Sequence, residues 1–169
     1  VQTCALPIYL AFLGDGTFVA SNVRLGPNGA ISQVYKFRRN GALVRGFDRN
    51  GVLTLSAKTW RKAAPRLKEA NALWPDKGGI APIGTNHLVV GLTAKLNGSG
   101  WRQVGFEIDG RGRIRKQPNG GLAFSLPAPD GRWSVYSAGP RRFYVSGRAG
   151  NPGKGARRDE LALYRFVDR

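Results

Sequence analysis

Three segments of the chain share one pattern: two short apolar runs separated by a tight turn, then a polar stretch and a third apolar run. The segments begin at Tyr9, Ile80 and Ser134. This repeat constrains the fold more than any other feature, because each unit can bury its apolar face against a neighbouring unit. The pattern predicts an array of similar β units rather than one enclosed pocket.

Turn-forming residues separate the first two apolar runs at 14–16, 84–86 and 139–141. Gly, Asp, Asn and Pro supply the backbone geometry that a short hairpin needs. The third strands are expected at Gln33–Phe37, Gln103–Ile108 and Leu161–Phe166, an alignment that matches Phe37 with Phe106 and Phe166. Turns at Asn40-Gly41 and Asp109-Gly110 then lead to expected fourth strands at Val52–Leu55 and Leu122–Leu126.

We therefore predict an all-β fold, a fragment of a β-propeller with about three four-stranded antiparallel units, the third incomplete. The predicted units cover residues 9–56, 78–126 and 132–169, within one repeat domain over 9–169. Residues 57–77 form a connecting insertion, in which Trp60–Ala72 has helix-forming residues interrupted by Pro65. A β-sandwich or meander is the alternative, because short strands and glycine turns recur there as well.

The polar stretches between the second and third strands are rich in Gly, Asn and basic residues. They cover Asn22–Ser32, Thr93–Arg102 and Arg148–Asp159. This composition is typical of exposed loops. Loops on a rigid β framework are where such folds carry recognition, so we expect ligand contacts on these three stretches.

The stretch Phe37–Val52 resembles the signature of the delta-60 repeat family, whose repeats place a Ser-Phe-Gly segment after an Asp-Gly turn. Gly46-Phe47-Asp48 stands at the Ser-Phe-Gly position, and Val44 stands where the family usually has Asp. The flanking strands Asp15–Ala20 and Leu161–Phe166 fit the family pattern too. The second unit keeps only Phe106 and Asp109-Gly110 of it.

This resemblance implies a bacterial β-propeller-like repeat of a kind often found in exported or surface proteins. It therefore implies an extracellular or cell-surface location. The family carries no general catalytic motif, so the resemblance assigns no active-site residue to this chain.

Residues Val1–Ile8 are similar to the in-frame translation of a common sequencing adapter, which we expect to be an artefact. On this interpretation the natural sequence continues from near Tyr9, and its own N-terminus, with any signal peptide, is missing. Cys4 is the one cysteine and falls in this segment, so the remaining chain offers no disulfide and no cysteine-based metal site. The alternative is a genuine apolar N-terminal strand.

The net charge of +17, from 27 basic and 10 acidic residues, favours polyanions such as nucleic acids, anionic lipid surfaces and acidic glycans. The expected partner is a protein, a glycan or another polyanion. The basic residues are distributed over every unit, which is also typical of solvated loop charge. The candidate polyanion contacts are Arg111, Arg113, Arg115, Lys116, Arg141, Arg142, Arg157 and Arg158. Non-specific nucleic-acid binding is expected of such a charge. No apolar run approaches the roughly 20 residues that a membrane-spanning helix needs.

The sequence predicts no catalytic residue, no cofactor site and no metal site. His87 is the only histidine and has no Gly-x-Ser-x-Gly segment to accompany it. Candidate acid pairs for glycoside hydrolysis, drawn from Glu107, Asp109, Asp159 and Glu160, occupy turn or edge positions. A phosphate-binding Gly loop followed by Lys and Ser or Thr is absent from the sequence.

The sequence thus favours a non-enzymatic binding or scaffold repeat domain that recognises its partner through inter-strand loops. Two alternatives remain open at this point. One is part of a larger propeller enzyme, of hydrolase or lyase type, whose active site lies in other blades. The other is an Arg-rich polyanion or nucleic-acid binder.

Overall fold

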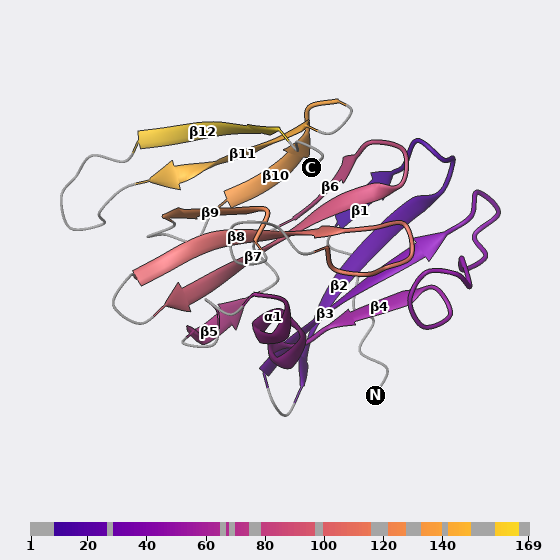
Figure 1. Cartoon of the computed structure of the whole chain (residues 1–169), viewed down its shortest axis with the longest axis horizontal. Coiled ribbons are helices and arrows are strands. Elements are labelled where there is room, and N and C mark those ends of the chain that lie inside the picture. Colours follow the sequence, from indigo (N-terminus) through magenta and orange to yellow (C-terminus); the bar gives the residue numbers. More distant parts are fainter. Residues whose placement is uncertain are drawn as a thin grey trace.

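The computed structural model describes residues 9–26, 29–64, 67, 70–74, 79–96, 100–115, 122–127, 133–139, 142–149 and 158–165. These residues form three antiparallel β-sheets in chain order and one short helix (Figure 1). The all-β class that the sequence predicts is confirmed.

The first sheet has the strand order β1-β2-β3-β4. Its strands are β1 (Tyr9–Phe12), β2 (Phe18–Gly26), β3 (Gly29–Phe37) and β4 (Val52–Leu55). Gly16 has a φ of 79° in the β1–β2 turn, a conformation that glycine adopts without steric cost. The Asp15 carboxylate accepts a hydrogen bond from the Thr17 N–H at 3.0 Å in the same turn.

Helix α1 (Ala57–Ala63) follows β4 directly. Ser56 caps it in a capping box with Thr59, which explains why the helix begins before Trp60. The helix stops at Ala64, whose extended backbone suits the residue that precedes Pro65. The predicted helical range Trp60–Ala72 is therefore wrong at both ends, and strand β5 begins at Ala70.

The second sheet has the order β5-β7-β8-β9, with β6 also paired to β7. Its strands are β5 (Ala70–Trp74), β6 (Ile80–Ile83), β7 (His87–Leu96), β8 (Gly100–Ile108) and β9 (Phe124–Pro127). The strands β5 and β6 pair with opposite halves of β7, since Trp74 lies opposite Thr93 and Ile80 lies opposite Val90. Part of the expected insertion 57–77 therefore belongs to this sheet.

The third sheet has the order β10-β11-β12. Its strands are β10 (Trp133–Ser137), β11 (Arg142–Ala149) and β12 (Arg158–Arg165). Their antiparallel register places Phe143 between Ser137 and Tyr164.

Two of the three expected recognition loops are mainly strand. Strands β2 and β3 pair without interruption from Phe18 and Phe37 to Gly26 and Gly29. The range Asn22–Ser32 is thus a long hairpin with a connection at 27–28, and Thr93–Arg102 lies mainly in the paired strands β7 and β8. Backbone pairing outweighs the local preference of Gly and Asn for turns. Of the third range, 148–159, residues 150–157 lie outside the described part of the chain.

The register also corrects the alignment of the units. Phe37 forms an isolated bridge with Leu43, and Ile108 forms the corresponding bridge with Ile114. Phe37 is therefore equivalent to Ile108 and not to Phe106, while Phe166 lies outside the described residues.

The turn that the sequence places at Asp109-Gly110 extends to Gly112, because Gly112 is the residue that matches Gly41. Gly112, with a φ of 79°, occupies the position of Gly41, with a φ of 80°. Asp109 opens that turn, because its carboxylate accepts the N–H groups of Arg111 and Arg113.

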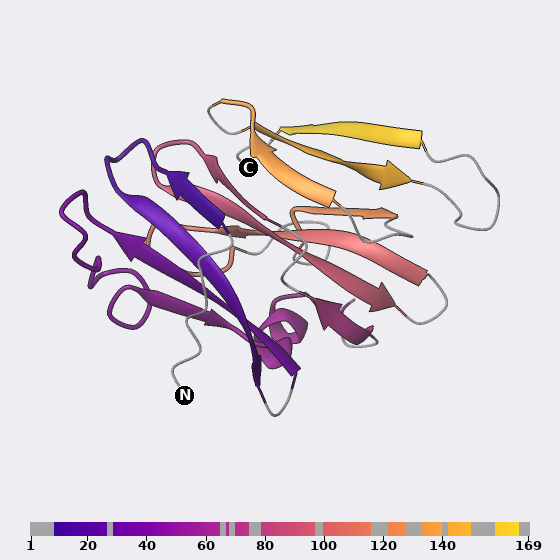
Figure 2. The same ribbon diagram turned by 180° about the vertical axis from the view of Figure 1, so that it is seen from behind.

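The sheets stack face to face in chain order, as both ribbon views show (Figures 1 and 2). One core cluster joins the first and second sheets and α1, and includes Val19, Val34, Leu88 and Phe106. The Trp60 ring of α1 contacts the Phe106 ring at a centroid distance of 4.5 Å.

A second core cluster joins the second and third sheets. It includes Val89, Phe124, Phe143 and Val145, and the rings of Phe124 and Phe143 lie 5.5 Å apart. The second sheet is therefore covered on both faces. The first strands of the three units are neighbours as well, since β1 contacts β6 and β6 contacts β10.

Candidate ligand-binding surface

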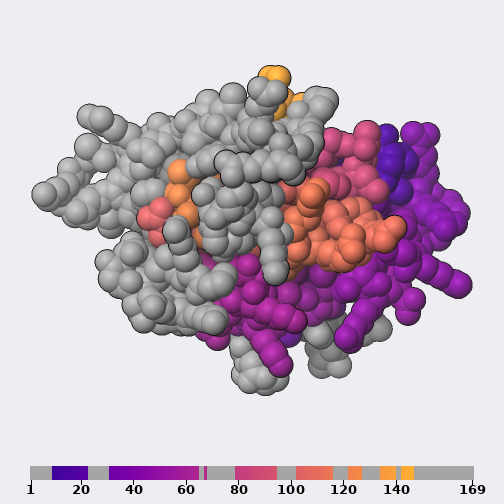
Figure 3. Space-filling view, in the orientation of Figure 1, coloured from indigo at the N-terminus to yellow at the C-terminus, as the bar shows by residue number. Residues whose placement is uncertain are grey.

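The β1–β2, β3–β4 and β6–β7 turns and the segment that follows β8 gather at one end of the sheets. We call this surface, formed by residues 13–17, 38–51, 84–86 and 109–115, the turn end. Its segments are bonded to one another, because the Asp15 N–H donates to the Thr85 carbonyl at 2.9 Å and the Asp48 N–H donates to the Arg111 carbonyl at 2.8 Å. In Figure 3, orange atoms of the second unit adjoin purple atoms of the first.

The long 38–51 segment is held by a buried aromatic ring. Phe47 has no exposed surface and belongs to the core between the first and second sheets. Asp48 and Asn50 adopt left-handed φ values of 40° and 55°, which Asp and Asn tolerate better than most residues. This anchoring fixes the segment that carries the exposed residues Arg38, Arg39, Arg45 and Arg49.

Lys36 lies buried at the junction of the first two units. Its ammonium group donates to the Asp15 carboxylate at 3.0 Å and to the Asn86 side-chain carbonyl. The Lys36 side chain is 3% exposed, whereas that of Asp15 is 28% exposed. A buried ammonium needs such partners, because an unpaired charge in the protein interior is costly. Lys36 is therefore a structural cation rather than a free contact for a ligand.

Glu107 occupies the equivalent position in the second unit. Lys36 lies opposite Val19 in the β2–β3 pair, and Glu107 lies opposite Val89 in the β7–β8 pair. The Glu107 carboxylate is 2.9 Å from Nδ1 of His87 and 3.7 Å from the Arg115 guanidinium. His87, the one histidine of the sequence, therefore lies beside a buried carboxylate.

Asp109 binds the neighbouring Arg113 by an ion pair of 2.9 Å. Burial would raise the pKa of the Asp109 carboxyl, but hydrogen bonds from Arg113 and Arg111 and the Arg113 charge outweigh it and hold the pKa below its usual value. The pKa of Asp15 is also lowered: burial opposes the shift, and hydrogen bonds from Thr17 together with Lys36 exceed that effect.

The structure brings three of the predicted polyanion contacts together. Arg111, Arg113 and Arg115 lie on one exposed segment of the turn end. Arg142 is exposed at the start of β11, and Arg158 is the first residue of β12. Lys116, Arg141 and Arg157 lie outside the described residues.

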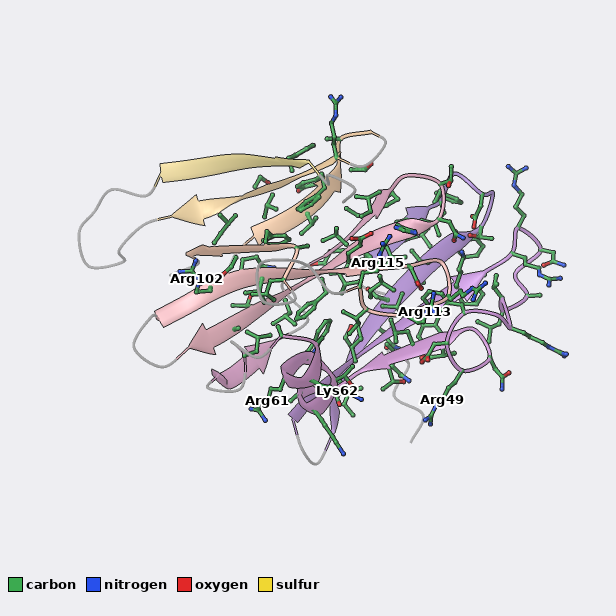
Figure 4. All side chains as sticks on the ribbon, in the orientation of Figure 1. Arg49, Arg61, Lys62, Arg102, Arg113 and Arg115 are labelled. Carbon is green, nitrogen blue, oxygen red and sulfur yellow. The ribbon has the colours of Figure 1, made fainter. Side chains whose placement is uncertain are left out.

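Four arginines of the 38–51 segment were not among the predicted contacts, although the sequence contains a signal for them. Arg38, Arg39, Arg45 and Arg49 all fall within the stretch Phe37–Val52. Figure 4 labels Arg49 on this segment and Arg113 and Arg115 on the 109–115 segment, while Arg61 and Lys62 extend from α1.

Among the described residues, no group of three or more His, Cys, Asp or Glu side chains is arranged to hold a metal ion. No described helix has the length and apolar character to cross a membrane.

No family model matches the chain, and no curated protein or solved structure matches it. The resemblance to the delta-60 repeat family therefore has no support beyond the residues that suggested it.

Proposed function

We propose that the protein is a non-enzymatic binding module of propeller-like β units that recognises an anionic partner through its turn end. The observation that carries this proposal is the surplus of exposed arginine on that surface. Arg38, Arg39, Arg45, Arg49 and Arg111 are all exposed there.

Most acidic groups at or beside the turn end are already engaged by basic side chains, and the exposed Asp48 is the exception among the described residues. Asp15 pairs with Lys36, Asp109 with Arg113, and Glu107 with His87 and Arg115. None of the five exposed arginines forms an ion pair with a carboxylate of the described residues. Their guanidinium groups are therefore available to phosphate, sulfate or carboxylate groups, which they bind in a bidentate geometry.

The propeller-like arrangement is supported by how the sheets meet. Antiparallel sheets of three or more strands pack face to face in chain order, and the first strands of successive units contact one another. Blades of a β-propeller are four-stranded sheets arranged around a central channel. In such an array the turn end forms one continuous rim, which suits an extended polyanion.

Salt-dependent binding of a short DNA duplex, used as a generic polyanion probe, tests the proposal. The double variant Arg45→Gln/Arg49→Gln is compared with Lys58→Gln/Lys62→Gln, which removes the same charge from exposed positions of α1. We expect fluorescence anisotropy to show weaker binding for the arginine variant and a slope of log K against log salt that is shallower by about 2.

The lysine control should keep the affinity and the salt slope of the parent protein. An equal loss of DNA affinity in the arginine and lysine variants would show that the net charge alone attracts the probe. The turn end would then not be the binding site. Binding that does not weaken between about 50 and about 200 mM salt would contradict an electrostatic interface altogether.

A further inference from the structure

The outer face of the first sheet carries a row of aromatic side chains, of which Phe12 is exposed and Phe18, Tyr35 and Phe37 are half-buried. Phe12 is 72% exposed and Leu10 is 58% exposed. The ring of Phe18 lies 5.9 Å from that of Phe12 and 5.0 Å from that of Phe37, and Tyr35 continues the row at 6.2 Å from Phe37. Large apolar side chains scattered singly are common on protein surfaces, but a contiguous row marks an interaction site.

The equivalent face is covered in the other two sheets. In the second sheet, Leu88 and Ile108 correspond to Phe18 and Phe37, and both are fully buried in the core shared with the first sheet. In the third sheet, Phe143 is fully buried against the second sheet. In both sheets, this face is covered by the preceding sheet in the chain, which contributes its opposite face to the contact.

The corresponding face of the third sheet is its outer face, and among the described residues it is exposed at Tyr136. Tyr136 is 44% exposed and stacks on Tyr144 at 5.0 Å. These two residues alternate with Val135, Phe143 and Val145, whose side chains face the second sheet. The outer faces of the first and third sheets cannot meet within one chain, because the second sheet lies between them (Figure 2).

We propose that the aromatic face of the first sheet docks on the tyrosine face of the third sheet of a second copy of this chain. The contact is head-to-tail, so two copies that close on each other form two identical interfaces. The described residues of each copy form three sheets, so the closed pair contains six of them, a number within the four to eight blades of known propellers. This inference rests on the stacking of the sheets and is independent of the anion-binding surface.

Light scattering coupled to size-exclusion chromatography of the 169-residue protein tests the contact. The expected mass is twice the 18.3 kDa of one chain, in a concentration-dependent equilibrium with the monomer. The variants Phe12→Asp and Tyr136→Asp should each be monomeric. Both side chains are largely or partly exposed, so circular dichroism should show the parent fold for each variant.

Mixing the two variants distinguishes a head-to-tail contact from other modes of association. The Phe12→Asp chain keeps an intact third-sheet face, and the Tyr136→Asp chain keeps an intact first-sheet face. The mixture therefore regains one unaltered interface and should recover dimer. Lys58→Gln, which makes the same one-unit change in net charge on α1, should dimerise like the parent protein.

Three outcomes would overturn the proposal. The first is a parent protein that stays monomeric over the whole concentration series. The second is a dimer that Phe12→Asp disrupts and Tyr136→Asp does not, which would indicate pairing of two first-sheet faces. The third is failure of the mixture to recover dimer while each variant keeps the parent fold.

Discussion

Equivalent positions in the first two units hold buried charges of opposite sign. Lys36 and Glu107 each lie one residue before the end of a third strand, and their side chains are 3% and 7% exposed. Each has an oppositely charged partner in its own unit, Asp15 for Lys36 and Arg115 for Glu107, and the Glu107 carboxylate also lies 2.9 Å from Nδ1 of His87. A buried charge must be paired, but the fold does not require a particular sign. The first and second sheets therefore share a backbone geometry at this position rather than a residue type.

The two aspartates of the turn end should differ in their contribution to stability. Asp15→Asn leaves the buried Lys36 ammonium without an anion and should lower the free energy of unfolding by about 3 kcal/mol. Asp109→Asn should cost about 1 kcal/mol or less, because the Arg113 side chain is 68% exposed and water replaces the lost contact. Urea unfolding followed by circular dichroism measures both values. Equal losses of unfolding free energy in Asp15→Asn and Asp109→Asn would contradict the structural role of Lys36.

Both aspartates should make the protein sensitive to acid. The folded-state pKa of Asp15 and of Asp109 lies below the ordinary value of 3.8. A depressed carboxyl pKa stabilises the fold above the unfolded-state pKa, and this stabilisation is lost as the pH falls through the folded-state pKa. We expect the Tm to fall between about pH 5 and pH 2, and to fall less in the double variant Asp15→Asn/Asp109→Asn. If the Tm of the parent protein and of the double variant fell equally with pH, Asp15 and Asp109 would not be the cause of the acid sensitivity.

At the scale of single elements, one strand of the second sheet depends on a glycine for close packing. A Cβ atom on Gly105 would lie 2.0 Å from the Phe124 ring, which covers this residue from the paired strand β9. Phe124 in turn contacts Phe143 of the third sheet. Glycine in β8 thus leaves room for the Phe124 ring to pack directly on this residue.

Gly105→Ala should therefore destabilise the protein by about 1–3 kcal/mol through overpacking. Gly46→Ala is the matched control, because no atom lies within 4 Å of its added Cβ and its φ is not positive. We expect the control to change the free energy of unfolding by less than about 0.5 kcal/mol. Similar effects of the two substitutions in thermal unfolding would show that the Phe124 ring shifts without cost.

The sequence predicted the strands of this fold better than the connections between them. Apolar runs and turn residues located the hairpins that begin at Tyr9, Ile80 and Ser134, since both signals are local. The range Asn22–Ser32 was misjudged because long-range pairing extends β2 and β3 through it. The junction of Lys36 with Asn86 joins two units, and no local pattern specifies which residues meet there.

At the scale of the whole molecule, the three sheets form a stack in which each contacts its neighbour through a separate core. Val34 belongs to the core between the first and second sheets, and Val145 belongs to the core between the second and third. Among the described residues the two clusters share no member. Stability in such a linear array is close to a sum of unit and interface contributions.

Substitutions in the two cores should consequently be additive. Val34→Ala and Val145→Ala each remove two buried methyl groups and should each cost about 2 kcal/mol. The double variant should lose the sum of the two values to within about 0.5 kcal/mol, because distant sites without common partners do not couple. Urea unfolding of the parent, both single variants and the double variant measures this coupling. A coupling energy above about 1 kcal/mol would mean that the second sheet transmits packing changes from one face to the other, and that the three sheets act as a single core rather than as a stack of separable units.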